Sequence, residues 1–278
     1  MFIGGLHRSG TSILNRLVHS HPDVSGFANT GAPEDEGQHL QTVYPTARAF
    51  GGPGRFCFDP GAHMTEASTE TPNVDGWKLM HQWATHLDLS RKALIEKSPP
   101  NLIRTRYLQA MFPDAKFVII VRHPIAVAMA TSKWCSDPLE RLIEHWCVGH
   151  ELFLSDAQML RHVLVLRYED FVSDPQRHLD CIYAFIGLGS VELNETVSNS
   201  NGRYFEAWER LGDMAHIERL EKRYEALLSR FGYRLKSPQI VDARRRPPPA
   251  PQFKRKFPDL MQIPRHLLAN MLPPLRSS

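Results

Sequence analysis

The sequence predicts an α/β fold in which a central parallel sheet lies between two layers of helices. Short apolar runs, each long enough for one buried strand, alternate with segments whose apolar residues recur at helical spacing. Strands separated by helices are joined by right-handed crossovers, which make the strands parallel. Residues 117–121 are continuously apolar and mostly β-branched, as expected of a strand that is covered on both faces. These observations indicate a three-layer α/β domain.

The first predicted elements are a strand, a glycine-containing loop that ends at Gly10, and a helix that begins at Thr11. This arrangement holds a phosphate on backbone N–H groups at the positive end of the helix. Residues 5–12 nearly match the Walker A pattern, but Thr11 stands where the nucleotide-binding lysine belongs, and the cation is Arg8 inside the loop. We therefore expect a P-loop-like fold that binds an anion, although it lacks the lysine used in ATP or GTP hydrolysis. A purely structural turn is the alternative.

The remaining elements follow in order. Pro22 ends the first helix, Asp174 and Pro175 have the chemistry of a helix start, and Gly187 and Gly232 close two later helices. Further strands are predicted at residues 93–97, 117–121 and 163–166, and further helices at about 101–111, from 124, at 138–160, at 175–186 and at 204–231. Residues 24–92 carry no clear periodicity but much glycine and proline, so we expect them to form loops that shape an acceptor pocket.

Composition divides the chain into one predicted domain, residues 1–236, and a basic, proline-rich tail, residues 237–278. From Lys236 onward there are nine basic and two acidic residues, which leaves 24 basic and 28 acidic residues in 1–235. The tail also holds nine of the 21 prolines. We interpret it as a solvated segment in preference to a nucleic-acid-binding one.

Several functional classes are not indicated. The four cysteines form no C-x-x-C pair and the 14 histidines show no convincing metal spacing, so we expect no metal site. No run of eighteen apolar residues and no leader-like segment is present, so we expect no membrane segment and a cytoplasmic location. The sequence carries no signal for an oligomeric state.

The loops that begin at Arg8, Lys97, Arg122 and Tyr168 each follow a predicted strand. In parallel sheets ligands bind outside the carboxyl ends of the strands, so we expect these loops to converge on one site.

Three ordered motifs resemble those of the sulfotransferases that use 3′-phosphoadenosine 5′-phosphosulfate (PAPS). They are Arg-Ser-Gly-Thr-Ser at 8–12, Val-Arg-His-Pro at 121–124 and Arg-Tyr-Glu-Asp-Phe at 167–171. The resemblance implies that PAPS is the co-substrate and that its binding residues are Arg8, Ser9, Gly10, Thr11, Ser12, Arg122 and Tyr168. Arg122 would bind the 3′-phosphate and Tyr168 the adenine. The family usually places a serine eight residues after this arginine, where this chain has Ala130, so this position supplies no hydroxyl to the phosphate.

The resemblance also implies catalytic groups. Lys97 matches the family lysine that stabilises the leaving phosphate, and Arg8 contributes from the phosphosulfate loop; a surface lysine paired with Glu96 is the alternative for Lys97. Other members of the family use a glutamate after the first helix as the base. We favour Glu36 over Glu34, expect both to face the pocket from an extended segment with Asp35 facing away, and keep His39 and His7 in reserve. An acidic surface turn is the alternative.

The predicted function is transfer of a sulfuryl group from PAPS to an acceptor hydroxyl, or less readily an amine. Aromatic residues in 24–92 suit a small-molecule, carbohydrate or peptide acceptor without choosing among them. The competing functions are a metal-dependent P-loop kinase of a small molecule and a non-catalytic nucleotide-binding protein.

Overall fold

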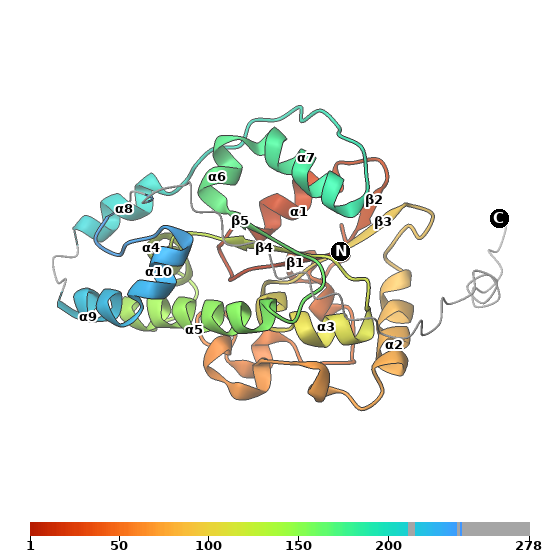
Figure 1. Cartoon of the computed structure of the whole chain (residues 1–278), viewed down its shortest axis with the longest axis horizontal. Coiled ribbons are helices and arrows are strands. Elements are labelled where there is room, and N and C mark those ends of the chain that lie inside the picture. The colour runs from red at the N-terminus through yellow and green to blue at the C-terminus, as the bar shows by residue number, and fades with distance from the viewer. Residues whose placement is uncertain (211–214, 238–239, 241–278) are drawn as a thin grey trace.

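The centre of the structure is a five-stranded parallel sheet with the order β2-β3-β1-β4-β5 (Figure 1). The structure, a computed structural model, describes residues 1–210, 215–237 and 240. The strands are β1 (Phe2–Gly4), β2 (Val24–Gly26), β3 (Ala93–Lys97), β4 (Phe117–Val121) and β5 (Val163–Arg167). The predicted α/β class with a central parallel sheet is confirmed.

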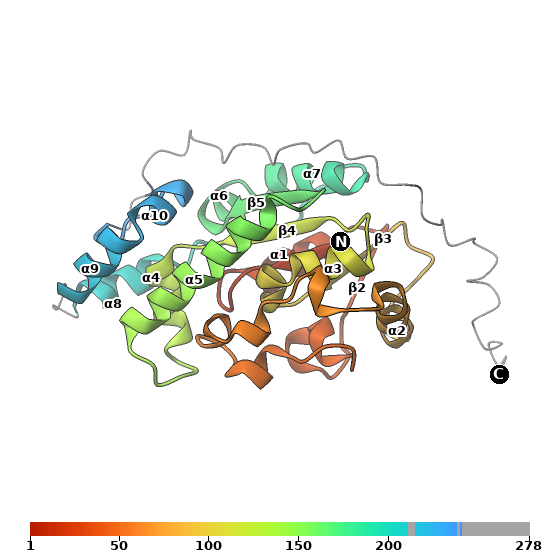
Figure 2. The same cartoon turned by 60° about the horizontal axis from the view of Figure 1, so that its bottom comes forward.

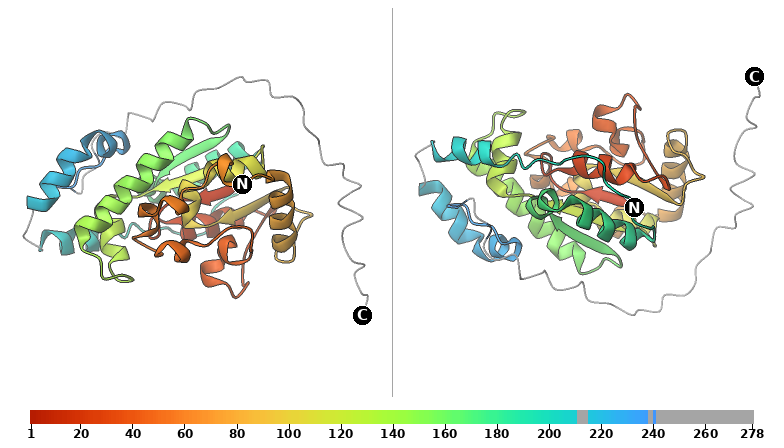
Figure 3. Two further views of the ribbon diagram at one scale, coloured as in Figure 1. Left: turned by 90° about the horizontal axis from the view of Figure 1, so that it is seen from below. Right: turned by 90° about the horizontal axis from the view of Figure 1, so that it is seen from above.

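Helices cover both faces of this sheet. The α-helices are α1 (Thr11–His19), α2 (Pro72–Ala84), α3 (Thr105–Met111), α4 (Pro124–Thr131), α5 (Leu139–Ala157), α6 (Tyr168–Ser173), α7 (Pro175–Ile186), α8 (Gly202–Glu209), α9 (Ala215–Arg223) and α10 (Glu225–Phe231). Helices α3 and α5 lie over one face, and α1, α6 and α7 lie over the other (Figures 1 and 3). Helices α8, α9 and α10 gather at one end of the molecule, beside α4 and α5 (Figure 2).

The alternation of side chains along β4 explains the two layers. Phe117, Ile119 and Val121 point into a core shared with α3 and α5, whereas Val118 and Ile120 point into a second core shared with α1 and α7. All five are fully buried. Successive side chains of a strand point to opposite faces, so a strand covered on both sides must be apolar throughout. This is the reason why the sequence identified β4 so clearly.

Residues 24–92 are more ordered than expected. They contain strand β2 at the edge of the sheet and helix α2, neither of which was predicted. Strand β2 is only three residues long and contains Ser25 and Gly26, so it carries no periodic signal. Between them lie six short 3-10 turns, η1 (Pro33–Asp35), η2 (Gly37–His39), η3 (Ala47–Phe50), η4 (Phe56–Phe58), η5 (Pro60–Ala62) and η6 (Glu66–Ser68).

The prediction of one continuous helix over 204–231 was wrong. Helix α8 ends at Glu209, and α9 and α10 are separated at Tyr224, whose φ of −110° and ψ of 21° leave helical geometry. The tyrosine ring is buried there, so packing of the ring accompanies the break. Residues 211–214 and nearly all of the predicted tail, 238–239 and 241–278, lie outside the described residues. Within the described part of the chain, no helix combines the length and hydropathy needed to cross a bilayer.

Candidate active site

A pocket of about 680 Å³ opens at the carboxyl ends of the strands. It brings together the loop after β1, the loops after β4 and β5, and the turns η1, η2 and η3. Its lining residues are His7, Arg8, Gly10, Thr11, Ser12, Ile13, Pro33, Glu34, Glu36, Gln38, His39, Ala47, Arg48, Gly51, Gly52, Pro53, Pro99, Arg122, Trp134, Tyr168, Ser198 and Ser200. The expected convergence of loops on one rim is therefore observed, with Lys97 directly behind the wall.

The first wall of the pocket is the N-terminus of α1. Gly10 is the N-cap residue with φ 104°, and no side chain caps the first turn, which also contains no acidic residue. The leading N–H groups of a helix have no partner inside the helix and carry partial positive charge, so this terminus is suited to bind an anion. A Cβ atom at position 10 would lie 2.7 Å from Cδ2 of Tyr168, so only glycine fits between the loop and the ring.

Two side chains of the loop, Ser9 and Arg8, have polar groups that could bind a ligand. The Ser9 hydroxyl is buried and makes no hydrogen bond within the described structure. Arg8 is exposed, adopts a left-handed φ of 68°, and places its guanidinium 4.8 Å from the centroid of the Trp134 ring. Buried hydroxyls without a partner are uncommon in proteins, so the orphaned Ser9 Oγ is consistent with a polar ligand at this loop.

Arg122 lies beside this loop in the pocket lining. Its guanidinium stacks 4.1 Å from the centroid of the Tyr168 ring and donates hydrogen bonds to Asn201 Oδ1 (2.8 Å), Ser200 Oγ (3.0 Å) and the carbonyl oxygen of Arg8 (3.0 Å). All three acceptors are uncharged. Burial lowers the pKa of Arg122, which is 6% exposed. Burying a cation that has no carboxylate in direct contact costs free energy. A phosphate monoester bound to the guanidinium would offset this cost, so the site is suited to such a group.

The sequence did not predict Ser200 and Asn201. Ser200 Oγ lies 3.3 Å from the Tyr168 hydroxyl and 3.0 Å from the Arg122 guanidinium. Ala130 is buried against Tyr204 and is not among the residues that line this pocket. The polar run at 198–201, Ser-Asn-Ser-Asn, was the available signal for this contribution. It was missed because its contact with Arg122 spans nearly 80 residues of sequence.

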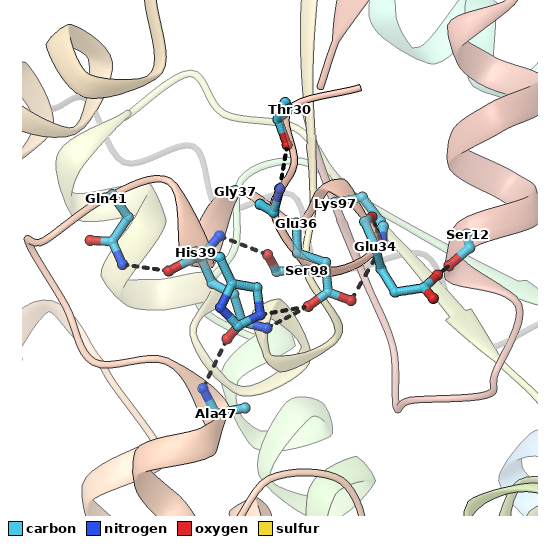
Figure 4. Close-up of polar contacts among 12 residues, drawn as sticks. Ser12, Thr30, Glu34, Glu36, Gly37, His39, Gln41, Ala47, Lys97 and Ser98 are labelled. Carbon is cyan, nitrogen blue, oxygen red and sulfur yellow. Dashed lines mark hydrogen bonds and ion pairs between the residues drawn. The ribbon is translucent and has the colours of Figure 1, made fainter. Parts of the chain in front are cut away.

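Lys97 and Glu36 form a buried pair at the other side of the pocket (Figure 4). Lys97 Nζ lies 3.3 Å from Glu36 Oε1 and donates a hydrogen bond of 2.8 Å to the carbonyl oxygen of Glu34. The side chain of Lys97 is 1% exposed, so the alternative of a surface lysine paired with Glu96 is wrong. Glu96 instead accepts hydrogen bonds from the Gly37 amide and from Ser98 Oγ, and burial raises its pKa to about 7.

Glu36 is held by further polar contacts. Gln38 Nε2 donates a 2.5 Å hydrogen bond to Glu36 Oε2, and His39 Nε2 lies 3.8 Å from the same oxygen. Burial raises the pKa of Glu36, and the nearby Lys97 charge opposes this rise. The carboxyl group is therefore a better base than an exposed glutamate, while a neighbouring cation keeps its ionised form accessible.

The backbone around Glu36 differs from the expected extended segment. Residues 33–35 form the 3-10 turn η1, with Glu34 at φ 52° and exposed. Both glutamates still line the pocket, and Glu34 Oε2 accepts a hydrogen bond from Ser12 Oγ at 3.3 Å. Asp35 faces away, as expected, because its carboxylate accepts hydrogen bonds from the backbone N–H groups of Asn29 and Thr30.

The two reserve bases are less suitable. Burial lowers the pKa of His7 to about 3, and burial with the nearby Lys97 charge also lowers the pKa of His39. A histidine with so low a pKa as His7 is a weak base at neutral pH. Glu36 is accordingly the basic group that the geometry favours, although its role stays a prediction.

Among residues 1–210, 215–237 and 240, no group of three or more histidine, cysteine or acidic side chains is arranged to hold a metal ion. The polar groups of the pocket instead suit a ligand with two separate anionic ends. One end has the uncapped α1 terminus and the orphaned Ser9 hydroxyl, and the other has the Arg122 guanidinium. Tyr168 lies between them, against Gly10 and Arg122.

Comparison with known proteins places these features in context. Residues 1–192 match the family model described as "Sulfotransferase family". The chain is 25% identical over 200 residues to "Protein-tyrosine sulfotransferase 2" of Gallus gallus, covering 68% of this chain and 51% of that protein. It is 30% identical over 118 residues to an omega-hydroxy-beta-dihydromenaquinone-9 sulfotransferase of Mycobacterium bovis, covering 37% of this chain and 30% of that protein. The chain thus spans about half of the first relative and under a third of the second.

A solved sulfotransferase from Mycobacterium avium shares the fold, with a TM-score of 0.51, 13% identity, and coverage of 85% of this chain and 78% of that one. The family match extends over more than two thirds of the chain and includes the loop after β1, the Lys97 loop, the Arg122 loop and Tyr168. The resemblance stated from the three motifs is confirmed, and this chain belongs to the sulfotransferase family.

Proposed function

We propose that this protein transfers a sulfuryl group from PAPS to an acceptor hydroxyl, with an amine as the less favoured acceptor. The observation that carries the proposal is that one pocket is lined by the uncapped N-terminus of α1, by Arg122 and by Glu36, which pairs with the buried Lys97. PAPS carries a phosphosulfate on the 5′ carbon and a phosphate on the 3′ carbon of its ribose, and two separate anionic groups match this distribution of polar groups.

Different residues of the pocket would bind the different parts of PAPS. We assign the phosphosulfate to Arg8, the Ser9 hydroxyl and the N–H groups of residues 10–12. We assign the adenine to Tyr168 and the 3′-phosphate to Arg122. Ser200, whose hydroxyl lies against both Arg122 and Tyr168, supplies a hydroxyl where the family position Ala130 has none.

The chemistry then follows from the charges. PAPS supplies the sulfuryl group: its bond from sulfur to the phosphate oxygen breaks as the bond from sulfur to the acceptor oxygen forms. Glu36 accepts the acceptor proton. The Lys97 ammonium group lies beside Glu36 and favours the ionised form of its carboxyl group. It also stabilises the negative charge that grows on the leaving phosphate.

A hydroxyl acceptor is favoured because the names of the two relatives contain acceptors that carry one, a protein tyrosine and an omega-hydroxy dihydromenaquinone. The kinase alternative is less consistent with the site. Thr11 replaces the phosphate-binding lysine, and the residue directly after β4 is Arg122, where a magnesium-holding carboxylate is common.

The proposal is tested by calorimetric titration with adenosine 3′,5′-bisphosphate and with ATP plus magnesium, followed by transfer of radiolabelled sulfate from PAPS to a panel of alcohols, phenols and amines. We expect tight binding of the bisphosphate, weak binding of ATP, and label on at least one hydroxyl compound. Preference for ATP would support the kinase. Bisphosphate binding with no transfer to any acceptor would support a non-catalytic nucleotide-binding protein.

A further inference from the structure

Three arginines line the pocket among the described residues: Arg8, Arg48 and Arg122. None of them contacts a carboxylate within that part of the chain. Arg8 stacks on an indole, and Arg122 binds only neutral oxygens. Arginines outside the pocket commonly have an acidic partner, as Arg55 does in Asp137 and Arg106 does in Glu66. The lining also contains Glu34 and Glu36, and Glu169 acts on Arg122 from nearby, so the positive charge is partly balanced. The three guanidinium groups still lack a direct carboxylate contact and can bind anionic ligands.

The proposed donor accounts for two of these cations, because Arg8 and Arg122 lie at its two anionic ends. Arg48 is left over. It belongs to turn η3, in the part of the pocket lined by His39 and residues 51–53. The residue is exposed to solvent, and its side chain makes no hydrogen bond or ion pair among the described residues. A third cation of the pocket thus has no anion assigned to it by the donor.

The backbone of the turn that carries Arg48 is tied to the base. Gln38 uses one end of its amide to donate to Glu36 Oε2 at 2.5 Å and the other end to accept from the Ala47 amide at 2.8 Å. Gln38 is 1% exposed, so this bridge is buried. The turn closes at Gly51, whose N–H binds the Arg48 carbonyl oxygen and whose φ is 88°. The cation is therefore one residue from an amide that is tied to the Glu36 carboxylate.

The positive field of Arg48 extends to the groups around the base. After burial and Lys97, Arg48 is the third cause of the lowered pKa of His39, whose ring lies beside Glu36. A neutral group of the acceptor placed beside Arg48 would gain no charge–charge attraction, and a cationic group would be repelled.

We infer that the acceptor is a hydroxyl compound that also carries an anionic group, and that Arg48 binds this group while the hydroxyl faces Glu36. This inference rests on the proposed function. A guanidinium binds a carboxylate, phosphate or sulfate ester with two parallel hydrogen bonds, so Arg48 selects acceptors by charge and by the distance between hydroxyl and anion. The anion belongs either to a small acid or to an acidic neighbour of a hydroxyl in a peptide.

The test measures binding of matched probes to the full chain, free and saturated with adenosine 3′,5′-bisphosphate. The small-molecule pair is 4-hydroxyphenylacetate and its neutral amide, and the peptide pair is a short tyrosine peptide with glutamate or glutamine beside the tyrosine. We expect the anionic member of at least one pair to bind about tenfold more tightly, since a hydrogen-bonded charge contributes about 1.5 kcal/mol. The pair that responds identifies the source of the anion.

Arg48→Gln should abolish this preference, and Arg48→Lys should retain part of it. Arg55→Gln is the matched control, because Arg55 is an exposed arginine on the next turn that lies outside the pocket lining and pairs with Asp137. Equal binding of both members, preference for the neutral member, or binding of neither member in both pairs would overturn the inference. This test measures binding and needs no turnover, so its result does not depend on the sulfate-transfer test. Sulfate transfer to neutral acceptors alone would refute the inference and leave the proposed function intact.

Discussion

Replacing Glu36 with glutamine tests the central chemical assignment. Glutamine keeps the shape of the side chain and an oxygen that can accept a hydrogen bond, but it cannot take a proton from the acceptor. General bases contribute roughly 10²- to 10⁴-fold to rate, so turnover should fall by that factor, equivalent to about 3 to 5 kcal/mol in the barrier. Binding of adenosine 3′,5′-bisphosphate should change little, because Glu36 lies on the acceptor side of the pocket.

The pH dependence gives a second readout of the same variant. Burial raises the pKa of Glu36 above its usual value, and the base must be ionised to act. The wild-type rate should therefore rise with pH through this raised pKa and level off above it, whereas Glu36→Gln should lack the rise. The assay is the initial rate of labelled sulfate transfer between pH 4 and 9, with an acceptor that does not titrate in that range.

Two controls separate catalysis from structural damage. Glu34→Gln changes an exposed carboxylate whose side chain binds only Ser12 among the described residues, and it should alter the rate little. The thermal shift caused by adenosine 3′,5′-bisphosphate should be preserved in both variants. Glu36→Gln itself removes the charged partner of the buried Lys97–Glu36 pair, a loss that costs about 3 to 5 kcal/mol, so its unfolding temperature without ligand should fall while the ligand-induced shift remains. Wild-type rates in Glu36→Gln at every pH would refute the assignment and leave His39 or an already ionised acceptor as the base.

Three further variants test the donor side and the Glu96 cluster. Arg122→Ala should reduce the preference for adenosine 3′,5′-bisphosphate over adenosine 5′-monophosphate by at least about tenfold, since it removes charge-assisted hydrogen bonds worth about 1.5 to 3 kcal/mol each; unchanged discrimination in calorimetry would place the 3′-phosphate elsewhere. Gly10→Ala forces a Cβ to within 2.7 Å of Tyr168 in a backbone of φ 104°, so bisphosphate affinity should fall, and an unaltered dissociation constant would contradict the packing argument. Burial raises the pKa of Glu96 to about 7, so between pH 4.5 and 7 the folded chain keeps a proton that the unfolded chain has lost. The free energy of unfolding of the wild type relative to Glu96→Gln should therefore fall by roughly 3 kcal/mol over this range and then level off. A difference between the denaturant midpoints of the two proteins that stays constant with pH would refute the raised pKa.

Local signals in the sequence were sufficient for much of the fold. Strand β4 was identified because a strand buried on both faces must be continuously apolar, and helix α7 because Asp174, Pro175 and Gly187 have fixed roles at helix ends. Strand β2 and helix α2 were missed. The strand is only three residues long, and its stability comes from pairing with β3, a contact made by residues about 70 positions away.

The sequence by itself determined the glycine-containing loop before α1, the cation after β4 and the order of the motifs, because each depends on residues that are neighbours in the chain and on the rule that parallel strands end at one edge. Only the tertiary structure decided what these groups contact. The pairing of Lys97 with Glu36, the contacts of Arg122 with residues 200 and 201, and the Gln38 bridge to the Arg48 turn all join separate segments. Such contacts depend on how buried charges and amides find partners once the segments pack, and no local pattern of residues encodes that choice.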